Sequence, residues 1–282
     1  MESNRLDPAI PEHTSRIPVA SQRYVCIAAI FVAMGGLLAG YNTGVIAGAL
    51  IFIRTSFGLS TFEQGLVVSV VLVGAAVTAI SGGTLSDRFG RRKMLLITSL
   101  VFIAGALVCS VAPSIMILMA GRLILGVGIG LASSVVPLYI SEVAPAKARG
   151  SQVSLFQLAL TVGILLAYIA DYLFGASGSW RWMLGLAVVP GILLGGGMLY
   201  LPETPRYLAR QGQLDLARGV LTKIRGTPDV SAEFQEIKTA AQKREQHRSF
   251  SDLLLPAIRP ALIIGIGIAV FQQITGINTI IH

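Results

Sequence analysis

Long apolar runs separated by short polar segments dominate the chain. No residue between 24 and 53 is charged, and further apolar runs extend over 62–85, 94–112, 115–140, 151–174 and 182–201, with a last one from 261 onward. A helix rises about 1.5 Å per residue, so about 20 residues cross the roughly 30 Å hydrocarbon core of a bilayer. The pattern therefore predicts an all-α membrane protein with six complete spanning helices and part of a seventh.

The boundaries of these runs divide the chain into four predicted segments. Residues 1–23 form a polar tail, 24–201 a six-helix transmembrane unit, 202–260 a charged segment that favours helix but cannot span, and 261–282 a partial seventh helix. No short apolar core with a small-residue cleavage pattern follows the tail, so we expect no removable signal peptide.

Composition and the distribution of charge support the same class. Hydrophobic residues make up 54% and charged residues 13% of the 282 residues, which is too little charge for the surface of a soluble domain. All but three of the 22 Lys and Arg residues lie in the tail and in the second, fourth and sixth loops; the exceptions are Arg54, Arg122 and Arg181. This asymmetry predicts a multi-pass protein of the cell membrane whose tail and 202–260 linker are cytoplasmic. It accounts for the net charge of +8, so no nucleic-acid partner is expected.

Cysteines and histidines show no pattern of chemistry. Cys26 and Cys109 belong to opposite ends of the predicted bundle, and the three histidines are isolated. No nucleophile, base and orienting group converge in the sequence. We therefore expect no enzyme activity, no metal and no cofactor.

Polar residues inside the apolar runs point to a polar interior. In the first run, Gly36, Gly40, Gly44 and Gly48 recur every four residues, which predicts a close helix contact. Asn42 lies about 200° round the helix from Gly40 and Gly44, and its amide must meet a partner or a wet cavity. Arg122 also lies within an apolar run, at a depth that makes contact with Asn42 possible.

Two further runs carry stripes of hydroxyl and amide side chains. The run 151–174 contains Ser154, Gln157, Thr161, Tyr168, Asp171 and Tyr172, and the last run contains Gln272, Gln273, Thr275 and Asn278. Such a stripe must face inward in lipid. Many neutral polar groups with few charges favour a path for a neutral, hydroxyl-rich solute.

Acidic and basic residues meet at the predicted cytoplasmic ends of the helices. They are Asp87, Arg88, Gly90, Arg91 and Arg92 in the second loop, Glu142 and Arg149 in the fourth, and Glu203 and Arg206 at the start of the linker. Gly90 supplies a permissive backbone for a tight turn. We expect the acids and bases to pair across the bundle and to hold that side shut.

The ordered motifs are similar to those of the sugar porters of the major facilitator superfamily. They are GGTLSDRFGRR at 82–92, LGVGIG at 125–130 with Glu142 and Arg149 following, PETPR at 202–206 and QQITGIN at 272–278. The resemblance implies two six-helix halves, each of 3+3 inverted repeats. It implies a neutral monosaccharide, a hexose, pentose or similar polyol, as the substrate, with sugar contacts at Gln157, Gln272, Gln273 and Asn278. It also implies a cytoplasmic gate that includes Asp87, Arg91, Arg92, Glu142, Arg149 and Glu203.

Two departures from that family bear on function. Proton-coupled members carry an aspartate where this chain has Asn42, beside the arginine that matches Arg122, whereas facilitative members carry asparagine. An amide exchanges no proton near neutral pH, so we expect a facilitator. The alternatives are a symporter that uses another acid, with Asp171 the candidate, and a transport-incompetent sensor whose 202–260 segment binds a cytoplasmic partner. Because the chain ends at His282, we expect a fragment or truncated form that needs a second half for transport of a sugar whose identity the sequence does not specify.

Overall fold

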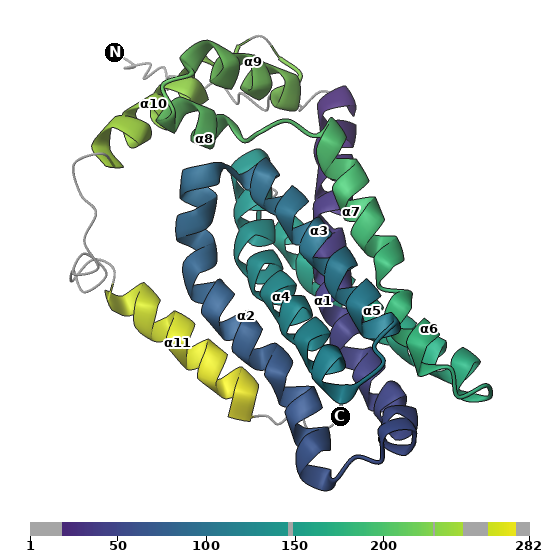
Figure 1. Cartoon of the computed structure of the whole chain (residues 1–282). Coiled ribbons are helices and arrows are strands. Elements are labelled where there is room, and N and C mark those ends of the chain that lie inside the picture. Colours follow the sequence, from purple (N-terminus) through teal and green to yellow (C-terminus); the bar gives the residue numbers. More distant parts are fainter. Residues whose placement is uncertain (1–18, 146–148, 228, 245–258, 275–282) are drawn as a thin grey trace, which may run out of the picture.

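The computed structural model describes residues 19–145, 149–227, 229–244 and 259–274, and within them it is built of helices without a strand. Figure 1 shows long helices packed side by side, with short helices gathered at one end. The elements are α1 (Val19–Phe57), α2 (Thr61–Phe89), α3 (Arg91–Ser110), α4 (Ile115–Val143), α5 (Arg149–Gly175), α6 (Trp180–Gly185), α7 (Val188–Tyr200), α8 (Pro205–Arg210), α9 (Leu214–Arg225), α10 (Ser231–Arg244) and α11 (Arg259–Ile274). We call the end that carries α8–α10 the linker end.

Six segments of the described chain are long and apolar enough to cross a membrane, as the hydropathy pattern predicts. They are Ile27–Phe57, Thr61–Phe89, Arg91–Ser110, Ile115–Val143, Ser154–Gly175 and Trp180–Tyr200. The first helix begins at Val19, five residues before the start expected from hydropathy. The sixth span is divided into α6 and α7. Pro190 lacks an N–H, so the Leu186 carbonyl accepts the Val189 N–H at 3.0 Å instead.

Local sequence explains where several helices begin. Ser60 starts α2 with a capping box, in which its hydroxyl accepts the Glu63 N–H and Glu63 accepts the Ser60 N–H at 2.9 Å. Gly90 separates α2 from α3 with φ of 95°, a conformation that favours glycine. Thr204 caps α8 just before Pro205, the usual place for proline at a helix start.

Small residues bring two pairs of helices into backbone contact. A Cβ on Gly40 of α1 would lie 2.7 Å from the carbonyl carbon of Leu160 in α5, and one on Gly126 of α4 would lie 2.9 Å from that of Val71 in α2. The ridge of glycines predicted for the first helix is therefore confirmed as the α1–α5 contact. In a 3+3 inverted repeat α1 corresponds to α4 and α5 to α2, so the same close contact occurs twice.

The linker helices form a small core of their own. Ala209, Ala217, Leu221, Val230 and Ile237 are buried together between α8, α9 and α10. The Arg225 guanidinium fastens this unit to the bundle, because it binds the Glu233 carboxylate at 2.7 and 2.8 Å and the Val143 carbonyl at the end of α4 at 2.9 Å. The linker therefore lies directly over the ends of the long helices.

Candidate functional site

Asn42 and Arg122 meet inside the bundle, but not through their side chains. Each is 2% exposed. The Asn42 amide donates to the Leu38 carbonyl of its own helix at 2.9 Å. The Arg122 guanidinium reaches the main-chain carbonyls of Asn42 at 3.5 Å and of Val67 in α2 at 3.4 Å. A buried cation is thus held by backbone dipoles of two helices, and within the described chain no carboxylate pairs with it.

The polar stripe of α5 lies on the outside of this six-helix unit. Gln157, Thr161, Tyr168 and Tyr172 are exposed, along with several apolar neighbours on the same helix. Asp171 differs from them, because one carboxylate oxygen accepts the Gly48 N–H of α1 at 3.2 Å. In lipid an exposed polar stripe needs a polar partner or water, so α5 presents a surface suited to a solute path or to further helices.

A charged network connects α2, α3, α4 and α8 at the linker end. Arg91 is 1% exposed, and its guanidinium binds Asp87 at 2.8 Å and Glu142 at 2.9 Å. Asp87 also binds Arg210 of α8 at 2.6 Å. The second oxygen of Glu142 accepts the Thr204 hydroxyl at 2.5 Å. Of the acids and bases expected to pair at this end, Asp87, Arg91 and Glu142 do so.

Glu203 acts differently from the expected pairing with an arginine side chain. Its carboxylate accepts the backbone N–H groups of Arg91 at 2.9 Å and of Arg92 at 3.1 Å. It thereby satisfies the free donors at the start of α3 and neutralises the positive end of that helix dipole. A Cβ on Gly90 would collide with this carboxylate. Among the described residues Glu203 pairs with no arginine side chain, because the turn at Gly90 places free main-chain donors beside its carboxylate.

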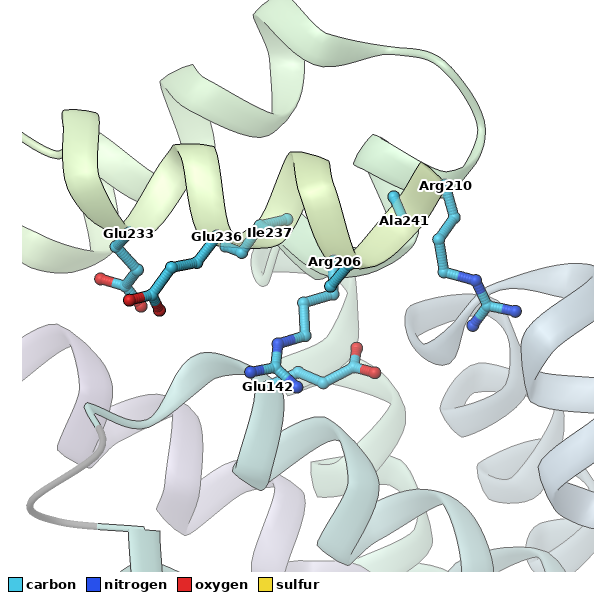
Figure 2. Close-up of a pocket in the computed structure, with 8 residues that line it drawn as sticks. Glu142, Arg206, Arg210, Glu233, Glu236, Ile237 and Ala241 are labelled. Carbon is cyan, nitrogen blue, oxygen red and sulfur yellow. The ribbon is translucent and has the colours of Figure 1, made fainter. Parts of the chain in front are cut away.

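The remaining arginines of the network have distinct partners. Arg92 donates to the carbonyls of Met198 at 2.9 Å and Leu199 at 2.8 Å, in the last turn of α7, where a cation complements the helix dipole. The main-chain carbonyl of Arg88 accepts the Tyr207 hydroxyl at 3.2 Å. Arg206 is exposed and lines a cavity of about 270 Å³. Figure 2 shows its side chain extending toward Glu142, beneath Glu233 and Glu236 of α10.

Several predicted residues cannot be placed. Gln272 and Gln273 belong to α11, but their side chains lie outside the described part of the structure, as does the side chain of Arg149 at the start of α5. Asn278 lies wholly outside the described residues. Their roles stay predictions.

Sequence reasoning missed three members of the network, namely Thr204, Tyr207 and Arg210. Thr204 had a recognisable signal, because threonine before proline is typical of a helix N-cap. Tyr207 and Arg210 had none. They reach the second loop, 119 and 123 residues away in sequence, only because α8 folds back over the ends of α2 and α3.

Comparison with known proteins identifies the family. The family model described as "Sugar (and other) transporter" matches residues 28–282. A D-xylose transporter of Levilactobacillus brevis is 47% identical over 89% of this chain and 55% of its own length. A galactose-proton symporter of Escherichia coli K12 is 41% identical over 92% of this chain and 55% of its own length. The chain thus spans about half the length of these curated relatives.

A solved structure gives the same result. The proton:xylose symporter XylE of the major facilitator superfamily superimposes with a TM-score of 0.83 at 30% identity, over 92% of this chain and 61% of that one. The chain belongs to the sugar transporter family, and its six apolar helices have the fold of one half of a major facilitator superfamily carrier.

Proposed function

We propose that this chain is the first half of a carrier that moves a neutral monosaccharide across the cell membrane by alternating access. The relatives that carry the words xylose, glucose and galactose in their names support a sugar substrate. The exposed polar stripe of α5 supports it too, because hydroxyl and amide groups match the hydroxyls of a sugar. In such carriers two halves rock about a shared site near the membrane midplane.

The side chains near Arg122 favour a facilitator. The Arg122 guanidinium contacts the main-chain carbonyl of Asn42. The side chain of Asn42 is an amide, which neither gains nor loses a proton in the physiological range. A carboxylate at this position could alternate between an ion pair and a neutral acid as the cavity opens. With an amide, opening and closing need not be accompanied by proton movement. This is the observation that carries the facilitator proposal.

Uptake by energised vesicles tests the coupling mode. The chain, continued by its own second half or by that of the Levilactobacillus brevis relative, is reconstituted and supplied with labelled xylose, glucose or galactose. We expect saturable equilibration without accumulation, and no effect of a protonophore. Accumulation that collapses with the protonophore would overturn the facilitator proposal.

Asp171 supports a second candidate, a sugar–proton symporter. Its Oδ2 accepts the Gly48 N–H, while its Oδ1 is buried and has no hydrogen-bond partner among the described residues. This carboxyl group can exchange a proton, which the Asn42 amide cannot. If accumulation is observed, Asp171→Asn should abolish it while leaving equilibration intact. Accumulation that survives this substitution would exclude Asp171 as the coupling group.

Gln157 is the proposed sugar contact within the described residues. In the same completed carrier, Gln157→Ala should raise the sugar concentration for half-maximal uptake by about tenfold, because one or two hydrogen bonds to a hydroxyl are lost. Gln235→Ala, the same change at an exposed position of α10, is the matched control and should leave uptake unchanged. Equal uptake by both variants would remove Gln157 from the site.

The distribution of basic residues supports a cytoplasmic linker end. Arg54 and Arg181 are the basic residues at the opposite end, and cytoplasmic loops are the ones enriched in Lys and Arg. A single cysteine placed at exposed Gln235 or at exposed Thr55 reports the orientation. We expect an impermeant thiol reagent added to intact cells to label position 55 and to spare position 235.

A further inference from the structure

An apolar groove lies on the outer face of the bundle at the end away from the linker helices. It has a volume of about 530 Å³ and runs between the end of α3 and the α6–α7 segment, with Leu107, Val111, Trp182, Leu186 and Val189 among its walls and Arg181 beside them. Val111 is 70% and Trp182 66% exposed. This volume is within the range of pockets that hold small organic ligands. None of the groups in the charged network or the polar stripe lines it.

The sequence builds the groove through a helix break and a close contact. Pro190 interrupts the hydrogen-bond pattern between α6 and α7, so the span is divided into two helices beside the end of α3. Gly185, also in the lining, lets α6 approach α3 so closely that a Cβ there would lie 3.3 Å from the Ser110 Cβ. Helices α3 and α6 are therefore in close contact at Gly185 and Ser110, and larger side chains on both sides of this contact line the groove.

Arg181 is fixed at one end of the groove with donors to spare. One terminal nitrogen donates to the Ala112 carbonyl at 3.2 Å, and the guanidinium lies 4.3 Å from the ring centre of Trp180. Trp180 is itself buried, and its ring nitrogen donates to the Ser56 hydroxyl at 3.1 Å. Within the described chain no carboxylate pairs with Arg181, and its Nε and other terminal nitrogen have no acceptor. A phosphate group matches this geometry.

The position of the groove in the membrane span specifies its occupant. Trp180–Tyr200 is the sixth span, so Arg181 and Trp182 lie at its boundary, where aromatic and basic side chains meet headgroups. Val189 lies eight residues further along, about 12 Å deeper. One leaflet contributes about 15 Å of hydrocarbon. An occupant with an anion at the boundary and a hydrocarbon chain of leaflet length is a phospholipid.

We infer that this groove is a binding site for an anionic phospholipid, which places one acyl chain between α3 and α6–α7 and its phosphate on Arg181. The site is separate from the proposed sugar path on α5 and does not depend on which sugar is carried. Charge selects the headgroup, and the apolar walls hold the chain.

The chain provides its own reporter for this site. It contains two tryptophans, the buried Trp180 and the groove-lining Trp182. In bilayers of mixed composition, brominated phosphatidylglycerol and brominated phosphatidylcholine quench a tryptophan that they touch. We expect phosphatidylglycerol to quench with about fivefold higher relative affinity, the effect of one arginine at the membrane surface. Trp182→Phe should remove most of the quenching.

Two variants and a control decide the inference. Arg181→Gln should lower the relative affinity for phosphatidylglycerol over phosphatidylcholine from about fivefold to about onefold. Arg54 is an exposed arginine at the same end of the bundle, and Arg54→Gln should leave the relative affinity unchanged. Val189→Phe fills the groove while keeping Arg181, and it should also remove the preference. A preference that persists in Val189→Phe, or that is lost equally in Arg54→Gln, would mean surface attraction without a site. Quenching that falls as protein density rises would assign the groove to a second copy of the chain instead.

Discussion

Replacing Gly40 by alanine tests whether the α1–α5 contact is as close as the structure has it. The new methyl carbon would lie 2.7 Å from the carbonyl carbon and 3.0 Å from the Cα of Leu160, and closer still to its carbonyl oxygen. These are backbone atoms, so no side chain can rotate away. The α5 helix would have to move outward by roughly 1 Å to restore ordinary contact, and such overpacking costs about 1 to 3 kcal/mol.

Gly65 is the matched control. It is an exposed helical glycine of α2, and a Cβ there would meet nothing within 4 Å. Gly65→Ala should stabilise the chain by about 0.5 to 1 kcal/mol, because alanine loses less backbone freedom in a helix. The two identical chemical changes should therefore differ by roughly 1.5 to 4 kcal/mol and have opposite signs.

Heating the detergent-solubilised chain and measuring the monodisperse fraction by size-exclusion chromatography gives the apparent melting temperature of each variant. A separation of about 3 °C or more between the two variants is expected from the energies above. If Gly40→Ala melts at or above the temperature of Gly65→Ala, the close backbone contact between α1 and α5 is refuted.

Three further predictions concern the charged network, coupling and the second half. Glu142→Gln should lower the melting temperature by several degrees, because breaking a buried ion pair costs about 3 kcal/mol. Glu236→Gln, at an exposed position of the same cavity, should leave the melting temperature unchanged. Equal effects of the two substitutions would contradict a stabilising ion pair between Glu142 and Arg91. Asn42→Asp in the completed carrier should make uptake depend on pH between 5 and 8, measured against wild type, and a flat profile would contradict the proposed coupling position. The 282-residue chain alone, in liposomes, should give no saturable sugar uptake above empty vesicles.

The sequence determined the class of the protein and the location of its six spans. Hydropathy is sufficient for this because a bilayer demands about 20 apolar residues per helix, whatever the neighbours are. The four-residue spacing of glycines from Gly36 to Gly48 likewise predicted a close helix contact, since residues four apart share one face. The ordered motifs supplied the family, which the comparisons confirmed.

Only the tertiary structure decided which groups meet. Glu203 caps α3 instead of pairing with an arginine, and Arg92 binds the last carbonyls of α7. The Arg122 guanidinium contacts the main-chain carbonyl of Asn42. The side-chain amide of Asn42 donates instead to the Leu38 carbonyl. These outcomes depend on how helices cross and where main-chain donors and carbonyls remain free, and residues 80 to 112 positions apart carry no sequence signal of that geometry. Helix formation is specified locally, whereas partner choice follows from packing.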